Sequence, residues 1–368
     1  MAGFAVCQSG ITTKRGLFAT MPIPAAIKIS YLSGIVKNNI TWLFLFVFIA
    51  PVAAQQPAKI VFAPTTFYHS FTSDCEPALS IRSGDTVETE TIDAMGVDKH
   101  GVRRARGGNP LTGPFVIEGA QPGDILAVKL IEVSLNRDYA KTSDVFVSRS
   151  MPKEIMRNFK KSRLVKWNID RQTNMAWIDS AASRFPQLTE FKVSVSPMLG
   201  CIGVAPAGNK KGILSFFQGP YGGNLDYNRV RTGSTVYLPV FQNGAYLFVG
   251  DGHAIQGDGE IAGNALETSM NVRFCVQVLK IDSLVLSDPR VEDPEYIMAL
   301  GTAKEVQDAL KNASRNLLDW IRRDYHLDLS EATQVLSTSV EYSIAEIADP
   351  NVVVVARMRK AILSSLKK

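Results

Sequence analysis

A chain of 368 residues with 46% hydrophobic and 20% charged residues has a globular composition and enough apolar residues for a sizeable core, which excludes a disordered chain. The formal net charge is +5, but residues 1–54 hold four basic residues and no acidic ones, so the rest of the chain is close to +1. A charge so near zero gives no reason to expect nucleic acid or an anionic membrane as a partner.

Residues 1–54 have the pattern of an export signal. Positive charges precede an apolar run over residues 40–52, and small residues precede Gln55 as at a signal cleavage site. The run is shorter than the roughly 20 residues that a membrane-spanning helix needs, which favours a cleaved signal over a retained anchor. The sequence therefore predicts an exported protein, periplasmic or secreted, without stable membrane insertion, whose mature domain covers residues 55–368.

Most of the mature chain has the pattern of β-strands. Short runs rich in β-branched and aromatic residues are bounded by Gly, Asn, Asp or Pro. The clearest runs cover residues 125–133, 235–241, 245–250, 271–281 and 351–357. This pattern predicts an α+β, mainly β protein built from sandwich-like or jelly-roll-like sheets.

Helices are expected only near the C-terminus. Thr302 followed by Glu305 is a capping-box pattern, and apolar residues then recur at helical spacing as far as Ile321. Asp328 and Glu331 open a second, shorter helix. The apolar side of the first helix is expected to pack on a sheet.

Residues 140–190 are rich in Lys, Arg and Ser, with scattered aromatic residues and no regular period. We expect an irregular insertion here, which either packs as an ordinary excursion or covers the functional site.

The mature chain holds Cys75, Cys201 and Cys275, an odd number with wide spacing and no C-x-x-C motif. A disulfide framework is therefore not expected. One disulfide with a leftover thiol and three buried thiols both remain open.

The chemistry-bearing residues are densest in residues 250–260, where Asp251, His253, Asp258 and Glu260 are separated mainly by small residues. Residues two apart on a strand face the same way, so Asp251 pairs with His253 and Asp258 with Glu260, and the residues between can turn the chain. Imidazole and carboxylates are ligands that zinc accepts. Two Asp-Gly turns with solvated carboxylates are the competing interpretation.

Two further polar segments stand upstream. A glycine-rich segment over residues 218–226 carries Asn224 and Asp226 two residues apart, and an alternating segment over 84–93 ends at Asp93. By itself the segment over 218–226 is only a loop. For the segment over 84–93, a solvated strand and a strand face that lines a functional site are equally consistent with the pattern.

Together these motifs resemble those of one known family. The matching segments are Gly84–Val87, Asn109–Pro114, Glu118–Asp124, Gly203–Pro206, Gly222–Asp226 and Gly250–Glu260. In content and order they are similar to the acetamidase/formamidase family, over nearly the whole mature chain. The resemblance implies a β-rich α+β fold, a short-chain carboxamide as substrate, hydrolysis to carboxylate and ammonia, and a divalent metal.

The resemblance also implies a set of site residues, namely Asn224, Asp226, Asp251, His253, Asp258 and Glu260, with Asp93 lining the site. Two positions depart from the family pattern. Tyr221 stands where many members have His, and Met198-Leu199 replaces a pair such as His-Pro. Each lost imidazole is expected to alter metal affinity or substrate choice.

The resulting hypothesis is a metal-assisted amidase, with zinc as the expected metal. His253, Asp251 and Asp258 hold the metal, with Asp93 as a possible further ligand, while Glu260 transfers the proton as a catalytic residue. Asn224 and Asp226 are the other catalytic residues, and Asn224 orients the amide. Which of Asp258 and Glu260 binds metal and which moves the proton stays open.

Two other interpretations remain. Cys201 could act as the nucleophile of a different amidase class, although a small buried residue in a glycine-flanked strand is the commoner case. An exported β-sandwich could also bind a metal or small polar ligand without catalysis. His69 and His100 are candidates for extra ligands, and a homo-oligomer is possible.

Overall fold

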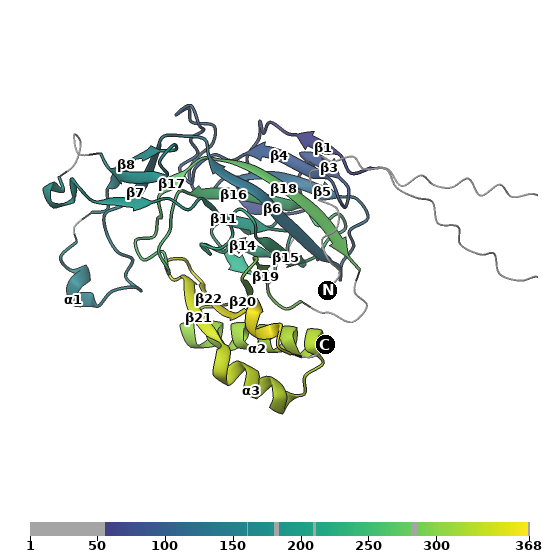
Figure 1. Ribbon diagram of the computed structural model, residues 1–368. Helices are drawn as coiled ribbons and strands as arrows, with labels where there is room; N and C mark the ends of the chain where they lie inside the picture. The colour runs from purple at the N-terminus through teal and green to yellow at the C-terminus, as the bar shows by residue number, and fades with distance from the viewer. Residues whose placement is uncertain (1–55, 160, 180–183, 209–210, 281–285, 367–368) are drawn as a thin grey trace, which may run out of the picture. The chain divides into compact units, whose positions relative to one another are not determined.

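The structure is a computed structural model that describes residues 56–159, 161–179, 184–208, 211–280 and 286–366. These residues form two large, mostly antiparallel sheets and a few helices (Figure 1). The mainly β prediction with C-terminal helices is thereby confirmed. The expected export signal, residues 1–54, lies outside the described residues.

The first sheet has nine strands. In sheet order they are β1 (Lys59–Val61), β4 (Thr86–Glu90), β18 (Met270–Leu279), β6 (Ile125–Leu135), β15 (Thr235–Pro239), β19 (Arg290–Glu292), β20 (Tyr296–Ala303), β22 (Val352–Arg359) and β21 (Glu341–Glu346).

The second sheet has eleven strands, and a two-stranded sheet lies beside them. The main path of the second sheet is β10 (Lys192–Ser194), β9 (Met175–Ile178), β8 (Leu164–Asp170), β7 (Tyr139–Ser143), β17 (Glu267–Thr268), β16 (Leu247–His253), β11 (Met198–Gly203), β14 (Gly222–Asn224) and β13 (Gln218–Gly219). The remaining strands are β5 (Leu111–Ile117) on β16, β3 (Leu79–Ile81) on β5, and the pair β2 (Ser70–Phe71) and β12 (Ile213–Leu214).

The two large sheets share one hydrophobic core. Phe274 of β18 and Val128 of β6 lie in the same buried cluster as Ile202 of β11 and Phe248 of β16. On β18, Val272, Phe274 and Val276 stand two residues apart and are all buried. This packing holds β11 and β16, which carry the candidate site, against a rigid neighbour.

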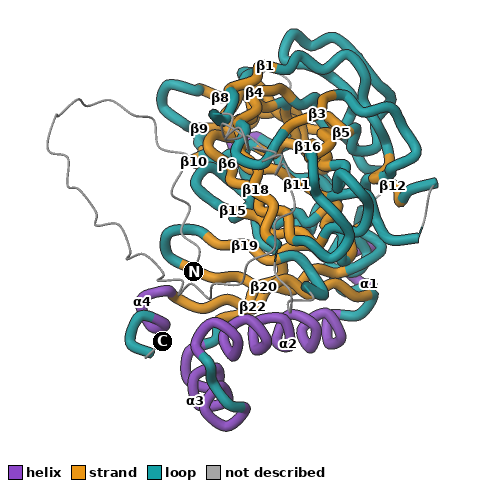
Figure 2. The backbone as a smooth tube through the Cα atoms, turned by 90° about the vertical axis from the view of Figure 1, so that its right-hand side faces the viewer, coloured by secondary structure: helices purple, strands orange, loops and turns teal. Residues whose placement is uncertain are grey.

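A second core lies beneath β20 and β22, where helix α2 (Val306–Tyr325) packs (Figure 2). The approach is close because Gly301 has no side chain; a Cβ there would overlap the backbone of α2. The predicted capping box at Thr302 does not form, since Thr302 belongs to β20 and the helix starts after Glu305 without a side-chain cap. In α3 (Leu329–Ser339) the capping box of Asp328 and Glu331 is present.

Residues 140–190 are more regular than the sequence predicts. They contain the strands β7, β8 and β9, which extend one end of the second sheet, and the short helices α1 (Lys153–Met156) and η2 (Pro186–Leu188), with loops and turns between them (Figure 1). Trp167, Ile169 and Ile178 point into the core from these strands. The two-residue period of these strands is hard to recognise in the sequence, because each strand is short and charged residues occupy the outer face.

The three cysteines in the described part of the chain are free thiols, so no disulfide joins them. Among the same residues, no helix is long and apolar enough to span a membrane. The short helix α4 (Lys360–Leu363) ends the described chain.

Asp288, which precedes β19, is predicted to make stability depend on pH. Burial raises its pKa to about 6, and hydrogen bonds from Ser287 and the Thr302 backbone offset only part of that effect. The folded carboxyl therefore holds its proton more tightly than the unfolded one, so its contribution to stability is full below the ordinary pKa and is lost as pH rises towards 6. We expect Asp288→Asn to be more stable than the parent at pH 7.5, by on the order of 2 kcal/mol, with no difference near pH 3.5.

Urea unfolding at both pH values measures this difference. The Asn side chain keeps the acceptor for Thr302, so a difference that is the same at both pH values would contradict the assignment to ionisation.

Candidate functional site

The centre of the candidate site is the end of strand β16, which brings Asp251 and His253 to one face. Strand β11 runs antiparallel beside it, with Met198 opposite His253 and Leu199 opposite Gly252. Gly200 of β11 therefore faces the two side chains. A Cβ on Gly200 would lie 2.7 Å from Asp251 Oδ2 and closer still to Asp226 Oδ1, so the glycine is what lets these carboxylates meet.

The ring of His253 is held in one orientation by Gln256. The Gln256 amide nitrogen donates to the backbone carbonyls of Asp226 and Ala345, which turns its oxygen towards His253 Nδ1 at 2.8 Å. Since that oxygen can only accept, Nδ1 must carry a proton. The other nitrogen, Nε2, then faces the carboxylates of Asp251 and Glu267 at 3.4 Å and 3.2 Å.

The close approach of His253 Nε2 to the carboxylates of Asp251 and Glu267 needs a positive charge among these atoms. His253 Nε2, Asp251 Oδ1 and Glu267 Oε2 are all buried, and within the described residues none has a hydrogen-bond partner. Burial by itself would lower the pKa of His253, but the carboxylates of Glu267 and Asp251 outweigh it and hold that pKa well above its usual range. A proton or a divalent cation at this position would relieve the repulsion.

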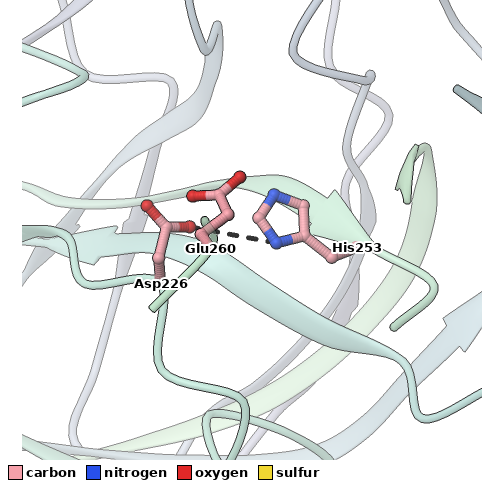
Figure 3. A group of neighbouring side chains, drawn as sticks. All are labelled: Asp226, His253 and Glu260. Atoms are coloured by element: carbon pink, nitrogen blue, oxygen red, sulfur yellow. Dashed lines mark ion pairs between the residues drawn. The ribbon is translucent and has the colours of Figure 1, made fainter. Parts of the chain in front are cut away.

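A second group of potential ligands shares the same imidazole. Single ligand atoms of Asp226, His253 and Glu260 lie within 4.8 Å of one another, as do those of Asp251, His253 and Glu267. Figure 3 shows Asp226 and Glu260 directed at the ring of His253, with Asp226 Oδ1 at 3.9 Å from Nδ1.

Three of these acids have left-handed backbone conformations, with φ of 42° at Asp226, 54° at Asp251 and 45° at Glu260. Residues with a Cβ seldom adopt such φ values, and they gather at functional sites because the surrounding structure must enforce them. Here the strained backbone turns each carboxylate inward.

Side-chain amides link the acids to one another. Asn224 donates from Nδ2 to Asp226 and, at 2.9 Å, to Asp349, while its Oδ1 accepts from Asn109. Asn109 also donates to Asp251 Oδ2 at 3.0 Å. The amides thus bridge carboxylates that would otherwise repel.

Four participants were missed by the sequence interpretation. Glu267 lies on the short strand β17, opposite His253 in the sheet register. Glu346 is the last residue of β21 and Asp349 lies in the loop that follows, where Glu346 accepts from the Asp349 backbone N–H. Asn109 comes from the loop before β5. Asn109 stands in one of the family-like motifs, whereas the other three have no distinctive local pattern.

The loop that bears Asp349 is hydrogen-bonded to Arg149, which belongs to the insertion of residues 140–190. Arg149 donates from its guanidinium to the backbone carbonyls of Asp349 at 2.8 Å, Pro350 at 3.4 Å and Ile347 at 3.5 Å. The insertion therefore contacts an element of the site, although the contact is with the loop rather than with the cluster itself.

Two predicted ligands lie outside the cluster. Asp258 is exposed and accepts a hydrogen bond from Asn228 at 2.7 Å, because the chain leaves the strand after His253 and the alternation no longer holds. Asp93 is buried but uses both oxygens elsewhere, accepting from the Met95 and Val97 backbone and, at 2.8 Å, from Arg137. Glu267 takes the place beside Asp251 and His253 that the sequence analysis assigned to Asp258 and Asp93.

The remaining candidates are also placed. Cys201 is buried next to Asn224, and burial together with the Asp251 and Asp226 carboxylates raises its pKa well above the usual value. A thiol held neutral in this way is a poor nucleophile. His69 contacts the Arg106 carbonyl rather than the cluster, and His100 is exposed.

Comparison with known proteins identifies the family of this chain. A model of the family described as "Acetamidase/Formamidase family" matches residues 58–211 and 219–365. A candidate formamidase of Schizosaccharomyces pombe is 26% identical over 60% of this chain and 65% of its own length. A formamidase of Methylophilus methylotrophus is 27% identical over 41% of this chain and 46% of its own length. The chain thus spans less than two thirds of these two relatives.

A solved structure described as a "predicted acetamidase/formamidase" from Thermoanaerobacter tengcongensis is also similar. It superposes with a TM-score of 0.70 at 25% identity, covering 84% of this chain and 98% of the solved one. The likeness thus covers most of this chain.

The space at Gly200 in which the Asp251 and Asp226 carboxylates meet, here called the cradle, can be filled by mutation. In Gly200→Ala the new methyl group must displace the carboxylates of Asp251 and Asp226, so we expect zinc affinity to fall by about 10-fold or more. Competition with a chromophoric chelator measures that affinity. Gly257→Ala is the matched control in the same motif, because a Cβ there meets nothing within 4 Å. Equal affinities in the two variants would refute the role of the cradle.

Proposed function

The chain belongs to the acetamidase/formamidase family, and from that premise we propose that it hydrolyses a short primary carboxamide to a carboxylate and ammonia with the help of a divalent metal ion. The observation that carries this proposal is a set of three buried atoms that have no hydrogen-bond partner in the described part of the chain, namely His253 Nε2, Asp251 Oδ1 and Glu267 Oε2. We propose zinc as the metal.

The donor set fits zinc on its chemistry. One imidazole nitrogen and two carboxylate oxygens are borderline and hard donors of the kind that catalytic zinc sites combine, with a further position left for substrate or water. A zinc ion held by Asp251, His253 and Glu267 would supply a Lewis acid that polarises the amide carbonyl. Gln256 supports this role, because it fixes the protonated Nδ1 and leaves Nε2 free for the ion.

The residues themselves must handle the proton. Hydrolysis removes a proton from water and delivers one to the departing amine, so a group that can hold a proton near neutral pH is required. Burial, with the Asp226 carboxylate as the next cause, raises the pKa of Glu260 well above its usual range, and Glu346 lies beside it. We propose that Glu260 carries this proton and that Glu346 shares it.

The amide groups would position the substrate. Asn224 stands between the two carboxylate groups, with its Nδ2 towards Asp226 and Asp349 and its Oδ1 towards Asn109. In our proposal Asp226 holds Asn224 in place, and Asn224 orients the amide before attack.

Glu267 and Asp258 are expected to differ in their effect on zinc binding and on amide turnover. Glu267→Gln removes a ligand charge, so we expect loss of bound zinc and a fall in kcat/KM for formamide or acetamide of more than about 100-fold. Asp258→Asn is the control, because its carboxylate is exposed, and we expect it to keep both properties. Zinc content by mass spectrometry and ammonia release by a coupled assay provide the measurements.

Two results would count against the proposal. Parent protein that binds zinc but releases no ammonia from any amide from formamide to butyramide would be a binding protein rather than an amidase. A Glu267→Gln variant with undiminished zinc and turnover would remove Glu267 from the site.

We also propose that the protein is exported, on the basis of the charge and hydrophobic pattern of residues 1–54. Expression of the full chain in a bacterial host should then yield mature protein outside the cytoplasm, and N-terminal sequencing should begin at Gln55. Protein recovered in the cytoplasm with residues 1–54 attached would contradict this expectation.

A further inference from the structure

A cavity of about 480 Å³ lies next to the buried cluster. It is bounded by strand β13, the end of β20 and the first turns of α2, and its polar wall includes Gln218, Asp288, Thr302, Lys304, Asn312 and Arg315. Such a wall suits a small polar molecule better than an apolar one.

Gln218 stands between this cavity and the cluster. Its side chain is 3% exposed, and its Nε2 donates to Asp349 Oδ2 at 3.0 Å. The same Asp349 oxygen accepts from Asn224 at 2.9 Å, and Asn224 in turn donates to Asp226. A single side chain and one carboxylate therefore separate the cavity from the amide that contacts the cluster.

The backbone of Gln218 is fixed by a hydrogen bond, but only the nitrogen of its side-chain amide has a hydrogen-bond partner among the described residues. Its carbonyl accepts from Asn351 at 3.0 Å, which fixes the main chain. Its side-chain Oε1 is buried, and among the described residues it has no hydrogen-bond partner. A buried acceptor without a partner costs about 1–3 kcal/mol. Rotation into the cavity, towards Lys304 or Arg315, would therefore exchange one hydrogen bond for another at little cost.

The Gln218 side chain also has the chemistry of the proposed substrate. Both are primary carboxamides, with two N–H donors and one carbonyl acceptor. Asp349 Oδ2 already accepts one such donor from Gln218 and another from Asn224. An incoming amide could take the place of the Gln218 amide without any change in its partner.

We infer that the cavity beside Gln218 is the route by which a short primary carboxamide reaches the cluster, and that Asp349 Oδ2 accepts the N–H of that amide once Gln218 swings aside. Gln218 is then the gate that limits acyl size, and Asp349 is the substrate-binding carboxylate. This inference rests on the proposed amidase function, because it names the substrate's entry and its binding partner.

A kinetic experiment tests the gate. In Gln218→Ala the barrier is shortened while Asp349 stays, so longer acyl chains should gain more than short ones. We expect the ratio of kcat/KM for butyramide to kcat/KM for formamide to rise by about 10-fold or more, as for one or two methylene groups admitted to a pocket. Gln172→Ala, an exposed glutamine in the turn after β8, is the control and should leave the ratio unchanged. An unchanged ratio in Gln218→Ala would overturn the gate.

A labelling experiment tests the route without any need for turnover. Cys201 is fully buried behind Asn224, with its Sγ 2.7 Å from Asn224 Oδ1. Methyl methanethiosulfonate is small enough to serve as the probe, and peptide mass spectrometry reports its addition at each cysteine. All proteins are labelled at the same alkaline pH, because burial keeps the Cys201 thiol protonated at neutral pH. We expect Cys201 to be labelled at least about 5-fold faster in Gln218→Ala. It should be labelled more slowly in Ser287→Trp, which fills the exposed rim of the cavity.

Cys275, buried in β18 of the other large sheet, is the internal control for general opening of the fold. Labelling of Cys201 that is unaffected by both variants would overturn the route, and so would equal acceleration at Cys275. Should the parent protein release no ammonia, the proposed function would fail, but the labelling rates would still decide whether the cavity leads to the cluster.

Discussion

The structure depends on one electrostatic constraint, the close approach of several carboxylates around the single imidazole of His253. Asp226, Asp251 and Glu267 are buried beside it, and like charges at this range in a low dielectric repel strongly. Such a cluster survives only where protons, a cation and hydrogen-bond donors share its charge. The raised pKa values of Glu260 and of Asp349, the latter to about 7, with burial the largest cause of each, express the same constraint.

The fold meets this constraint with rigid backbone rather than with local flexibility. Strands β11 and β16 lie inside a sheet packed against a second sheet, so the cluster has a fixed platform. Gly200 leaves room for the carboxylates, and left-handed backbone at Asp226 and Glu260 aims their side chains inward. Amide side chains, above all Asn224, supply hydrogen-bond donors to the buried carboxylates.

The central motif was predictable in its first half and less so in its second. Asp251 and His253 belong to one strand, so the two-residue period places them together as expected. Beyond His253 the chain turns. The interpretation as a solvated turn applies to Asp258, and the interpretation as a functional site applies to Glu260. Asp258 is an exposed turn carboxylate, whereas Glu260, with φ of 45°, points back to the imidazole. The alternation rule has no force outside a strand, which is why Asp258 does not join Glu260 beside the imidazole.

The sequence by itself determined the fold class, the main strands, the capped helix α3 and the family, because these depend on local periodicity, turn residues and motif order. Only the tertiary structure decided which acids meet. Glu267, Glu346 and Asp349 reach His253 and Asn224 through strand register and loop packing, and no local pattern records those contacts. In the same way Asp93 paired with Arg137 instead of the cluster, since a buried arginine lay within its reach. Side-chain convergence across distant segments is set by packing, whereas secondary structure is set by neighbours in the chain.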